Sequence, residues 1–141
     1  GAPVGSCIAG DGATIARGRW LRKRFGGGMR QSGLLAAACL HALDHHLERL
    51  AEDHHHARRL ATELDNPLLS VNHPVDTNIV VIDVTAPGTA AGLVDHLAAR
   101  EILTLPFGPG RVRLIPNLGT GPAAIDATLA ALGQYRGEDG A

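Results

Sequence analysis

The chain has 141 residues, of which 45% are hydrophobic and 19% charged, and its formal net charge is −1 at pH 7. This supply of apolar side chains is enough for a folded core and argues against a wholly disordered chain. The nearly balanced charge excludes a globally basic nucleic-acid-binding protein, although it does not exclude a local basic patch.

The cysteine and methionine counts indicate the cellular compartment of the protein and whether the chain is part of a longer one. Two cysteines, Cys7 and Cys39, are too few for a disulfide framework and indicate free thiols in a reducing compartment. No apolar run approaches the roughly 20 residues of a membrane span, and the first residues lack the pattern of a signal peptide. We therefore expect a cytoplasmic protein without a membrane partner. Met29 is the only methionine, so we expect a piece of a longer protein.

The first half of the chain is predicted to be mainly helical. Residues 2–9 are small and apolar and are expected to form a buried strand. Residues 14–25 are expected to form a helix with Asp11 as its cap. A triple glycine at 26–28 then breaks the chain. From residue 29 to about 65 one long helix is predicted, because leucines recur there at spacings of three and four.

The second half alternates between strand and helix signals. Strands are expected where β-branched and alternating residues recur, at 68–71, 77–84, 102–105 and 111–115. Helices are expected at 90–100 and 122–132, a turn at 107–110, and a loose tail from Gly137. This order predicts a small α+β layer, with a sheet on one side and helices on the other.

A basic segment surrounds the triple glycine. Six of the 13 Lys and Arg residues lie between Arg17 and Arg30. Bare glycine backbone lets an anion approach amide N–H groups, and the N-terminus of the following helix favours negative charge. Residues 26–30 are therefore a candidate phosphate site, with a glycine hinge beside a solvated helix as the alternative. Nucleic acid is a weaker interpretation, because one Trp and one Tyr provide no stacking platform.

The eight histidines give no metal signature. His41 and His45 are four residues apart on the predicted helix and could share an ion. The triplet at 54–56 cannot converge on one ion, because consecutive helical residues point about 100° apart. No HExxH pattern is present, and no metal site is expected.

Judged from the residues alone, Arg113 is the strongest candidate for a ligand-binding residue. In the alternating segment 111–115 it shares one face with Arg111, while Val112 and Leu114 share the other. An arginine at a sheet edge can bind a carboxylate through two parallel hydrogen bonds. The alternative is a surface arginine paired with an Asp or Glu.

Several strings in order give a family resemblance. They are GAPVGS (1–6), LRK (21–23), GGGMRQSG (26–33), RLAEDH (49–54), DTNI (76–79) and RVRL (111–114). Together they resemble the C-terminal portion of the low-specificity L-threonine aldolases of the beta-eliminating lyase family. The resemblance covers nearly the whole chain, and GGGMRQSG is its most specific part.

The resemblance implies both a fold and an activity. The fold is α/β, a fragment of the aspartate-aminotransferase-like fold of pyridoxal-phosphate enzymes, with a long helix and a small sheet covered by helices. Residues 1–33 would be the tail of the cofactor-binding large domain, and residues 34–141 the long helix and small domain. The reaction would be cleavage of L-threonine or L-allo-threonine to glycine and acetaldehyde, in a homodimer or homotetramer.

The resemblance also implies residue roles. Arg113 matches the arginine that binds the substrate α-carboxylate, and Lys23 and Arg30 match basic residues near the cofactor phosphate or a neighbouring subunit's site. The lysine that forms the Schiff base is expected to fall just before Gly1, so no catalytic residue is assigned and the chain alone is expected to be inactive. After Arg113 the family commonly has Leu-Val-Thr-His, whereas this chain has Leu114-Ile115-Pro116-Asn117. The alternatives are another pyridoxal-phosphate lyase of this fold and a non-enzymatic anion-binding domain that retains it.

Overall fold

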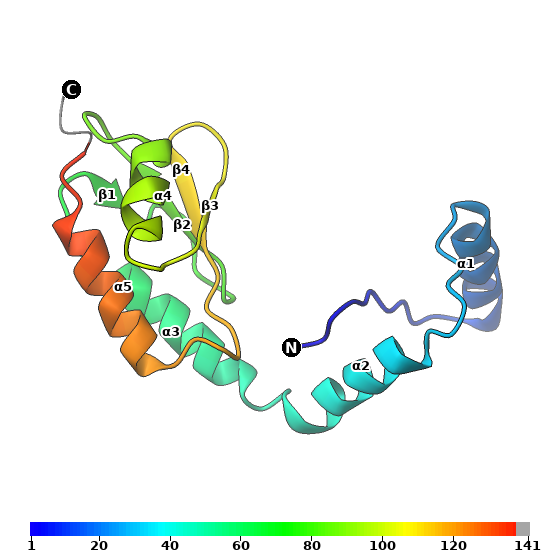
Figure 1. Ribbon diagram of the computed structural model, residues 1–141. Helices are drawn as coiled ribbons and strands as arrows, with labels where there is room; N and C mark the ends of the chain where they lie inside the picture. The colour runs from blue at the N-terminus through cyan, green and yellow to red at the C-terminus, as the bar shows by residue number, and fades with distance from the viewer. Residues whose placement is uncertain (138–141) are drawn as a thin grey trace. The chain divides into compact units, whose positions relative to one another are not determined.

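The computed structural model describes residues 1–137 (Figure 1). Its contacts form two compact units, which divide between Glu48 and Arg49. The tail expected from Gly137 onward lies outside the described residues except for Gly137 itself.

Unit 1, residues 1–48, contains helices α1 (Gly12–Arg24) and α2 (Gly33–His45). The predicted cap of α1 is confirmed: Asp11 Oδ1 accepts a hydrogen bond of 2.7 Å from the Thr14 amide. This hydrogen bond lowers the pKa of Asp11. Neither helix has a buried residue.

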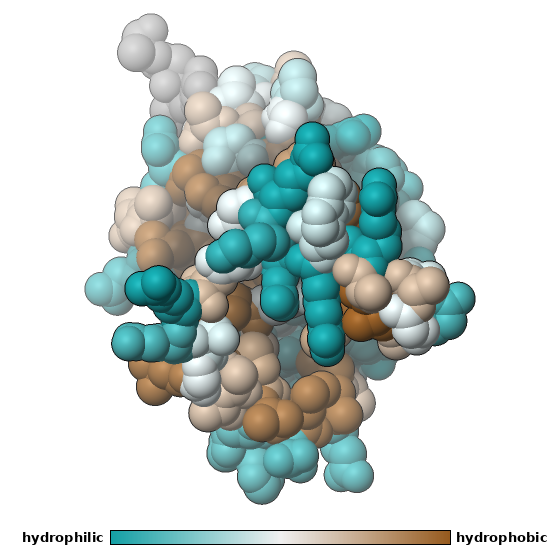
Figure 2. Space-filling model, turned by 90° about the vertical axis from the view of Figure 1, so that its right-hand side faces the viewer, coloured by the Kyte–Doolittle hydropathy of each residue, from teal (hydrophilic) through white to brown (hydrophobic). Residues whose placement is uncertain are grey.

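The basic side chains of α1 remain on the surface. Trp20 lies between two of them, with the guanidinium carbons of Arg17 and Arg24 at 4.8 and 5.0 Å from the ring centroid. The basic residues of α1, namely Arg17, Arg19, Arg22, Lys23 and Arg24, are all exposed. Figure 2 shows hydrophilic side chains gathered on one face of the molecule. The segment therefore forms a local basic patch.

Two expectations for the first half were wrong. Residues 2–9 are exposed and form no strand. Unit 1 contains no other strand, so their N–H and C=O groups have no ladder to join. The single helix expected at 29–65 is instead two helices, α2 and α3 (Leu50–Thr62), separated by residues 46–49. No Gly or Pro marks that break. Helix α2 ends with Asp44 and His45, and His46 begins the break. These three residues are weaker helix formers than the leucines and alanines around them.

Unit 2 is the expected α+β layer. Its sheet has the strand order β1-β2-β4-β3, and every neighbouring pair is antiparallel. The strands are β1 (Leu69–Ser70), β2 (Val80–Val84), β3 (Leu105–Pro106) and β4 (Arg111–Leu114). Helices α3, α4 (Ala90–Ala98) and α5 (Pro122–Gln134) pack on one side of it (Figure 1). The predicted strand at 102–105 is mostly loop, because only residues 105 and 106 pair with β4.

Strand alternation divides the sheet into two faces. One face is buried under the helices and contributes to the core, with Val80 and Ile82 from β2 and Val112 and Leu114 from β4. They belong to one buried cluster with helical residues that include Leu60, Leu93, Leu97, Ile125 and Leu132. The opposite face, here called the outer face, carries the intervening residues of the same strands.

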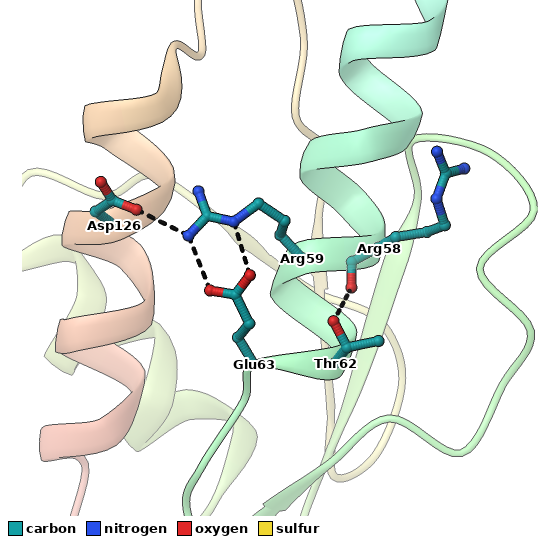
Figure 3. A network of polar contacts seen from close by, with 5 residues as sticks. All are labelled: Arg58, Arg59, Thr62, Glu63 and Asp126. Atoms are coloured by element: carbon teal, nitrogen blue, oxygen red, sulfur yellow. Dashed lines mark hydrogen bonds and ion pairs between the residues drawn. The ribbon is translucent and has the colours of Figure 1, made fainter.

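An ion-pair network links α3 to α5 (Figure 3). The Arg59 guanidinium donates two hydrogen bonds of 2.8 Å to Glu63, at the end of its own helix, and one of 3.0 Å to Asp126 on α5. These bonds lower the pKa of Glu63 and raise that of Arg59. One arginine thus closes α3 and fixes the neighbouring helix.

Asn66 joins the end of α3 to the end of α5. Its side-chain amide donates hydrogen bonds of 2.8 Å to the carbonyls of Leu132 and Tyr135, and its Oδ1 accepts one of 2.9 Å from the Leu68 amide. The side chain is buried, with 7% of the residue exposed. The Asn66 side chain therefore ties the segment after α3 to the end of α5.

We expect Asn66→Ala to lower the free energy of unfolding by about 1–3 kcal/mol, because three hydrogen bonds of a buried side chain to the backbone are lost. Urea unfolding of the 141-residue chain, followed by circular dichroism, measures this change. The control is Asn72→Ala, whose hydrogen bonds to Ser70 and Asp83 are exposed and whose effect should stay within about 0.5 kcal/mol. Equal destabilisation by both substitutions would contradict the assigned role of Asn66.

Candidate functional site

The candidate site lies on the outer face of the sheet, around β4. Arg111 and Arg113 both point to this face, since Val112 and Leu114 between and beside them are buried in the core. The two arginines nevertheless have different surroundings, because each faces different residues on the neighbouring strands.

Arg111 is held by a carboxylate. The antiparallel register places it directly opposite Asp83 on β2, and its Nε donates a hydrogen bond of 2.8 Å to Asp83 Oδ1. The other oxygen, Oδ2, accepts a hydrogen bond of 3.1 Å from Asn72 and lies 3.7 Å from His73 Nε2. Arg111 is therefore a surface arginine paired with an aspartate, the arrangement that was the alternative interpretation for Arg113.

The electrostatics of Asp83 follow from these contacts. Partial burial disfavours the charged carboxylate, but the hydrogen bonds from Arg111 and Asn72, with the positive charge of Arg111, outweigh it. The pKa of Asp83 is therefore lower than its ordinary value. Asp83 stays ionised at neutral pH and neutralises the guanidinium opposite it.

Arg113 has no such partner. Its neighbours across the two adjacent strands are Val81 and Leu105, which are apolar. Its Nε is buried without a hydrogen-bond partner, and Arg113 forms no ion pair with any residue from 1 to 137. The guanidinium carbon lies 5.5 Å from the ring centroid of Phe107. The structure thus leaves a half-buried cation with unused donor capacity at this place.

A glycine turn brings Phe107 to the outer face. Gly108 and Gly110 have φ angles of +85° and +69°, a region that glycine reaches without steric cost. The Phe107 amide donates a hydrogen bond of 2.8 Å to the Arg111 carbonyl, and the Gly110 carbonyl accepts one of 2.8 Å from Val84. The first bond closes the turn between β3 and β4, and the second ties it to β2, so the turn that the sequence predicts at 107–110 is confirmed.

Asn117 is the residue at which the sequence departs from the resembled pattern. Its Oδ1 accepts a hydrogen bond of 2.9 Å from the Gly119 amide, and its Nδ2 donates one of 3.2 Å to the Ile115 carbonyl. Its side chain therefore organises its own loop, and an amide carries no titratable proton near neutral pH.

In unit 1 the glycines at 26 and 27 end helix α1. Gly26 has a φ of +78°. The amides of Gly26 and Gly27 donate to the carbonyls of Lys23 and Arg22, at 3.3 and 2.8 Å. This is the Schellman ending of a helix. Two of the amides that the sequence offers to a phosphate are therefore already bonded.

A hollow of about 390 Å³ lies beside this segment. Arg22, Gly27, Met29 and Ser32 are among its lining residues, whereas Lys23 and Arg30 are not. Ser32 precedes α2 and its hydroxyl does not cap the helix. A guanidinium and a hydroxyl are suitable donors for a phosphate, whereas Val4, Leu35 and Ala36 make another part of the same lining apolar.

The histidines do not assemble into a metal centre in the described part of the chain. The rings of His41 and His45 lie 4.4 Å apart. Within residues 1–137 no group of three or more His, Cys, Asp or Glu side chains is placed to hold an ion. As for membranes, none of the helices among these residues combines the length and apolar character needed to cross a bilayer.

Comparisons with known proteins agree with the resemblance. Residues 1–87 match the family model described as "Beta-eliminating lyase". The chain is 41% identical over 119 residues to the "Probable low-specificity L-threonine aldolase 2" of Arabidopsis thaliana, covering 82% of this chain and 34% of the relative.

Two further relatives have similar names. The "Low-specificity L-threonine aldolase 1" of Arabidopsis thaliana is 36% identical over 138 residues, covering 95% of this chain and 38% of the relative. The "Low specificity L-threonine aldolase" of Escherichia coli strain K12 is 43% identical over 104 residues, covering 73% of this chain and 30% of the relative. The chain spans about a third of the length of these curated relatives.

The Asp83–Arg111 pair gives a pH prediction. Because the pKa of Asp83 is lowered below 3.8 in the fold, its stabilising contribution is fully present above that value and is lost as the pH falls through the lowered pKa. Arg111→Gln should raise the pKa of Asp83 toward or above the ordinary value. A carboxyl ¹³C NMR titration measures it, with Arg113→Gln as the control that leaves it unchanged. An unmoved Asp83 pKa in Arg111→Gln would contradict the pairing.

Proposed function

The chain belongs to the beta-eliminating lyase family, and we propose that it is the C-terminal part of a pyridoxal-phosphate-dependent threonine aldolase. The intact protein would cleave L-threonine or L-allo-threonine to glycine and acetaldehyde. The names of the relatives support this reaction. The observation that carries the site assignment is the half-buried guanidinium of Arg113, which has an unpartnered Nε.

We propose that Arg113 binds the α-carboxylate of the substrate. A guanidinium offers two parallel N–H groups that match the two oxygens of a carboxylate. Val81 and Leu105 give Arg113 no competing acceptor on the adjacent strands. Asp83 is occupied by Arg111. A substrate carboxylate is therefore a chemically matched partner for Arg113.

For the cofactor we propose pyridoxal 5′-phosphate. The hollow lined by Arg22 and Ser32 suits its phosphate, and the resemblance adds Lys23 and Arg30 as basic residues near it. When bound, the cofactor supplies an electron sink for the breaking Cα–Cβ bond. Lys23 is the only lysine in the chain, and it lies exposed at the end of α1. The residues of this chain therefore fit the phosphate end of the cofactor only, and we propose that the chain by itself is inactive.

We also propose that the intact protein is a cytoplasmic homo-oligomer, a dimer or tetramer. Helix α2 supports this, because it has no buried residue although Leu34, Leu40 and Leu43 are exposed on it. Apolar side chains in such number favour burial against another surface. In domain terms, we propose that residues 1–33 end the cofactor-binding domain and that residues 34–141 comprise the helical segment that follows it and the small domain.

A different pyridoxal-phosphate lyase of this fold is the nearer alternative. Assaying the intact protein with threonine, serine and tryptophan separates the two, because only a threonine aldolase releases acetaldehyde from threonine. A non-enzymatic anion-binding domain is the other alternative, and the same assay would then show no turnover with any of the three.

In the intact protein we expect Arg113→Lys to lower kcat/KM for threonine about ten- to a hundredfold. Lysine keeps the charge but loses the two parallel hydrogen bonds, and losing a charge-assisted bond costs roughly 1.5–3 kcal/mol. Cofactor occupancy should not change, because Arg113 lies on β4 and not among the phosphate donors. Cleavage kinetics and the cofactor absorbance spectrum measure the two effects.

Arg111→Lys is the matched control for this experiment. It changes an arginine on the same face of the same strand, but one whose Nε is already bonded to Asp83. Its effect on kcat/KM should be smaller. Wild-type kcat/KM in Arg113→Lys, or loss of the cofactor, would show that the carboxylate role is wrong.

The isolated 141-residue chain gives a separate prediction. Mixed with pyridoxal phosphate, it should show no absorbance band of a lysine-bound cofactor beyond slow nonspecific labelling. The reason is that Lys23, its only lysine, lies exposed in a basic helix. Borohydride trapping and mass spectrometry measure the linkage. Stoichiometric trapping on Lys23 together with threonine turnover would overturn the proposed inactivity of the chain.

A further inference from the structure

We propose that Phe107 is a positioning residue for Arg113, and that its ring holds the guanidinium in the place where the substrate carboxylate binds. This inference rests on the proposed function, since it concerns the carboxylate site of the same reaction. It concerns a residue that contacts Arg113 and need not touch the substrate.

Within residues 1–137, Phe107 is the residue whose ring contacts the charged end of Arg113. The residues beside it on β2 and β3, Val81 and Leu105, have no polar side-chain atom, and its Nε lacks a hydrogen-bond partner. An arginine without hydrogen bonds would sample several rotamers, and ordering it on binding would cost affinity. Among the described residues, the Phe107 ring lies 5.5 Å from the guanidinium carbon and so faces its charge.

A ring is well suited to this role. The negative face of the aromatic ring attracts a cation without using its N–H groups. A carboxylate of Asp or Glu in the same place would also attract the guanidinium, but it would occupy the donors that the substrate needs. Phe107 therefore restricts the position of Arg113 and leaves its hydrogen-bonding capacity free.

The ion pair with Asp83 keeps the Arg111 guanidinium away from the Phe107 ring. Phe107 lies opposite Arg111 across the β3–β4 pair, as the hydrogen bond from its amide to the Arg111 carbonyl shows. The Arg111 guanidinium, however, is bonded to Asp83 on the other side of β4. The Phe107 ring is therefore available to Arg113. Arg113 lies diagonally across the strand pair from Phe107, at a separation that long side chains can span.

The position of Phe107 tolerates substitution. The residue is 46% exposed and lies at the start of the glycine turn, outside the buried core. Its backbone contact to Arg111 is made by the amide and does not depend on the ring. Variants at this residue are therefore expected to fold, and a thermal melt checks this.

The test uses the intact, cofactor-loaded protein with three variants. Phe107→Leu keeps apolar bulk and removes the ring, and Phe107→Tyr keeps the ring. Leu103→Ala is the control, which removes an 89%-exposed apolar side chain just before β3 that is not paired with Arg113. The readouts are KM and kcat for threonine and the ¹H–¹⁵N NMR signal of Arg113 Nε, assigned by its loss in Arg113→Lys.

We expect Phe107→Leu to raise KM about two- to fivefold with kcat nearly unchanged, as loss of a cation–π contact at a partly exposed site implies. Its Arg113 Nε signal should lose the ring-current shift. Phe107→Tyr should keep both wild-type values, and Leu103→Ala should keep the signal.

Two outcomes would overturn the inference while leaving the proposed function intact. One is an active Phe107→Leu variant with wild-type KM. The other is a raised KM with an unmoved Arg113 Nε signal, which would mark a merely structural role. Failure of the wild-type protein to cleave threonine would refute the proposed function instead, and the NMR signal would still show whether the ring holds the guanidinium.

Discussion

The ion pair between Asp83 and Arg111 is the interaction on which the account of this chain depends. Two arginines two residues apart on one strand face would be equivalent in an isolated strand. The sheet register makes them different, because Asp83 lies opposite Arg111 while Val81 and Leu105 flank Arg113. One cation is neutralised inside the protein and the other is left with unused donors. This difference leaves Arg113 with the free hydrogen-bond donors that the proposed carboxylate site requires.

The rest of unit 2 keeps that face in place. The buried side chains of β2 and β4 pack under the three helices, so the residues between them must point outward. Asn66 and the Arg59 network tie the helix ends together behind the sheet. The glycines of the turn then allow the chain to reverse and to place Phe107 on the outer face. Core packing, helix connection and turn geometry thus all contribute to the surroundings of Arg113.

The sequence predicted local features well and long-range pairing poorly. The Asp11 cap, the α+β order of unit 2 and the two faces of β4 follow from spacing and side-chain chemistry. The roles of Asp83 and Phe107 were missed, since cross-strand register is not visible in a single strand. The break between α2 and α3 has no Gly or Pro to announce it. The glycines at 26 and 27 were interpreted from the sequence as part of a phosphate-binding loop, whereas their amides end helix α1.

The most direct test of the central claim is a crystal structure of the intact protein with glycine, the proposed amino-acid product, bound. We expect two hydrogen bonds of about 2.7–2.9 Å from the Arg113 guanidinium to the glycine carboxylate. We also expect Arg111 to remain bonded to Asp83. A carboxylate bound by Arg111, or bound without contact to Arg113, would contradict the account.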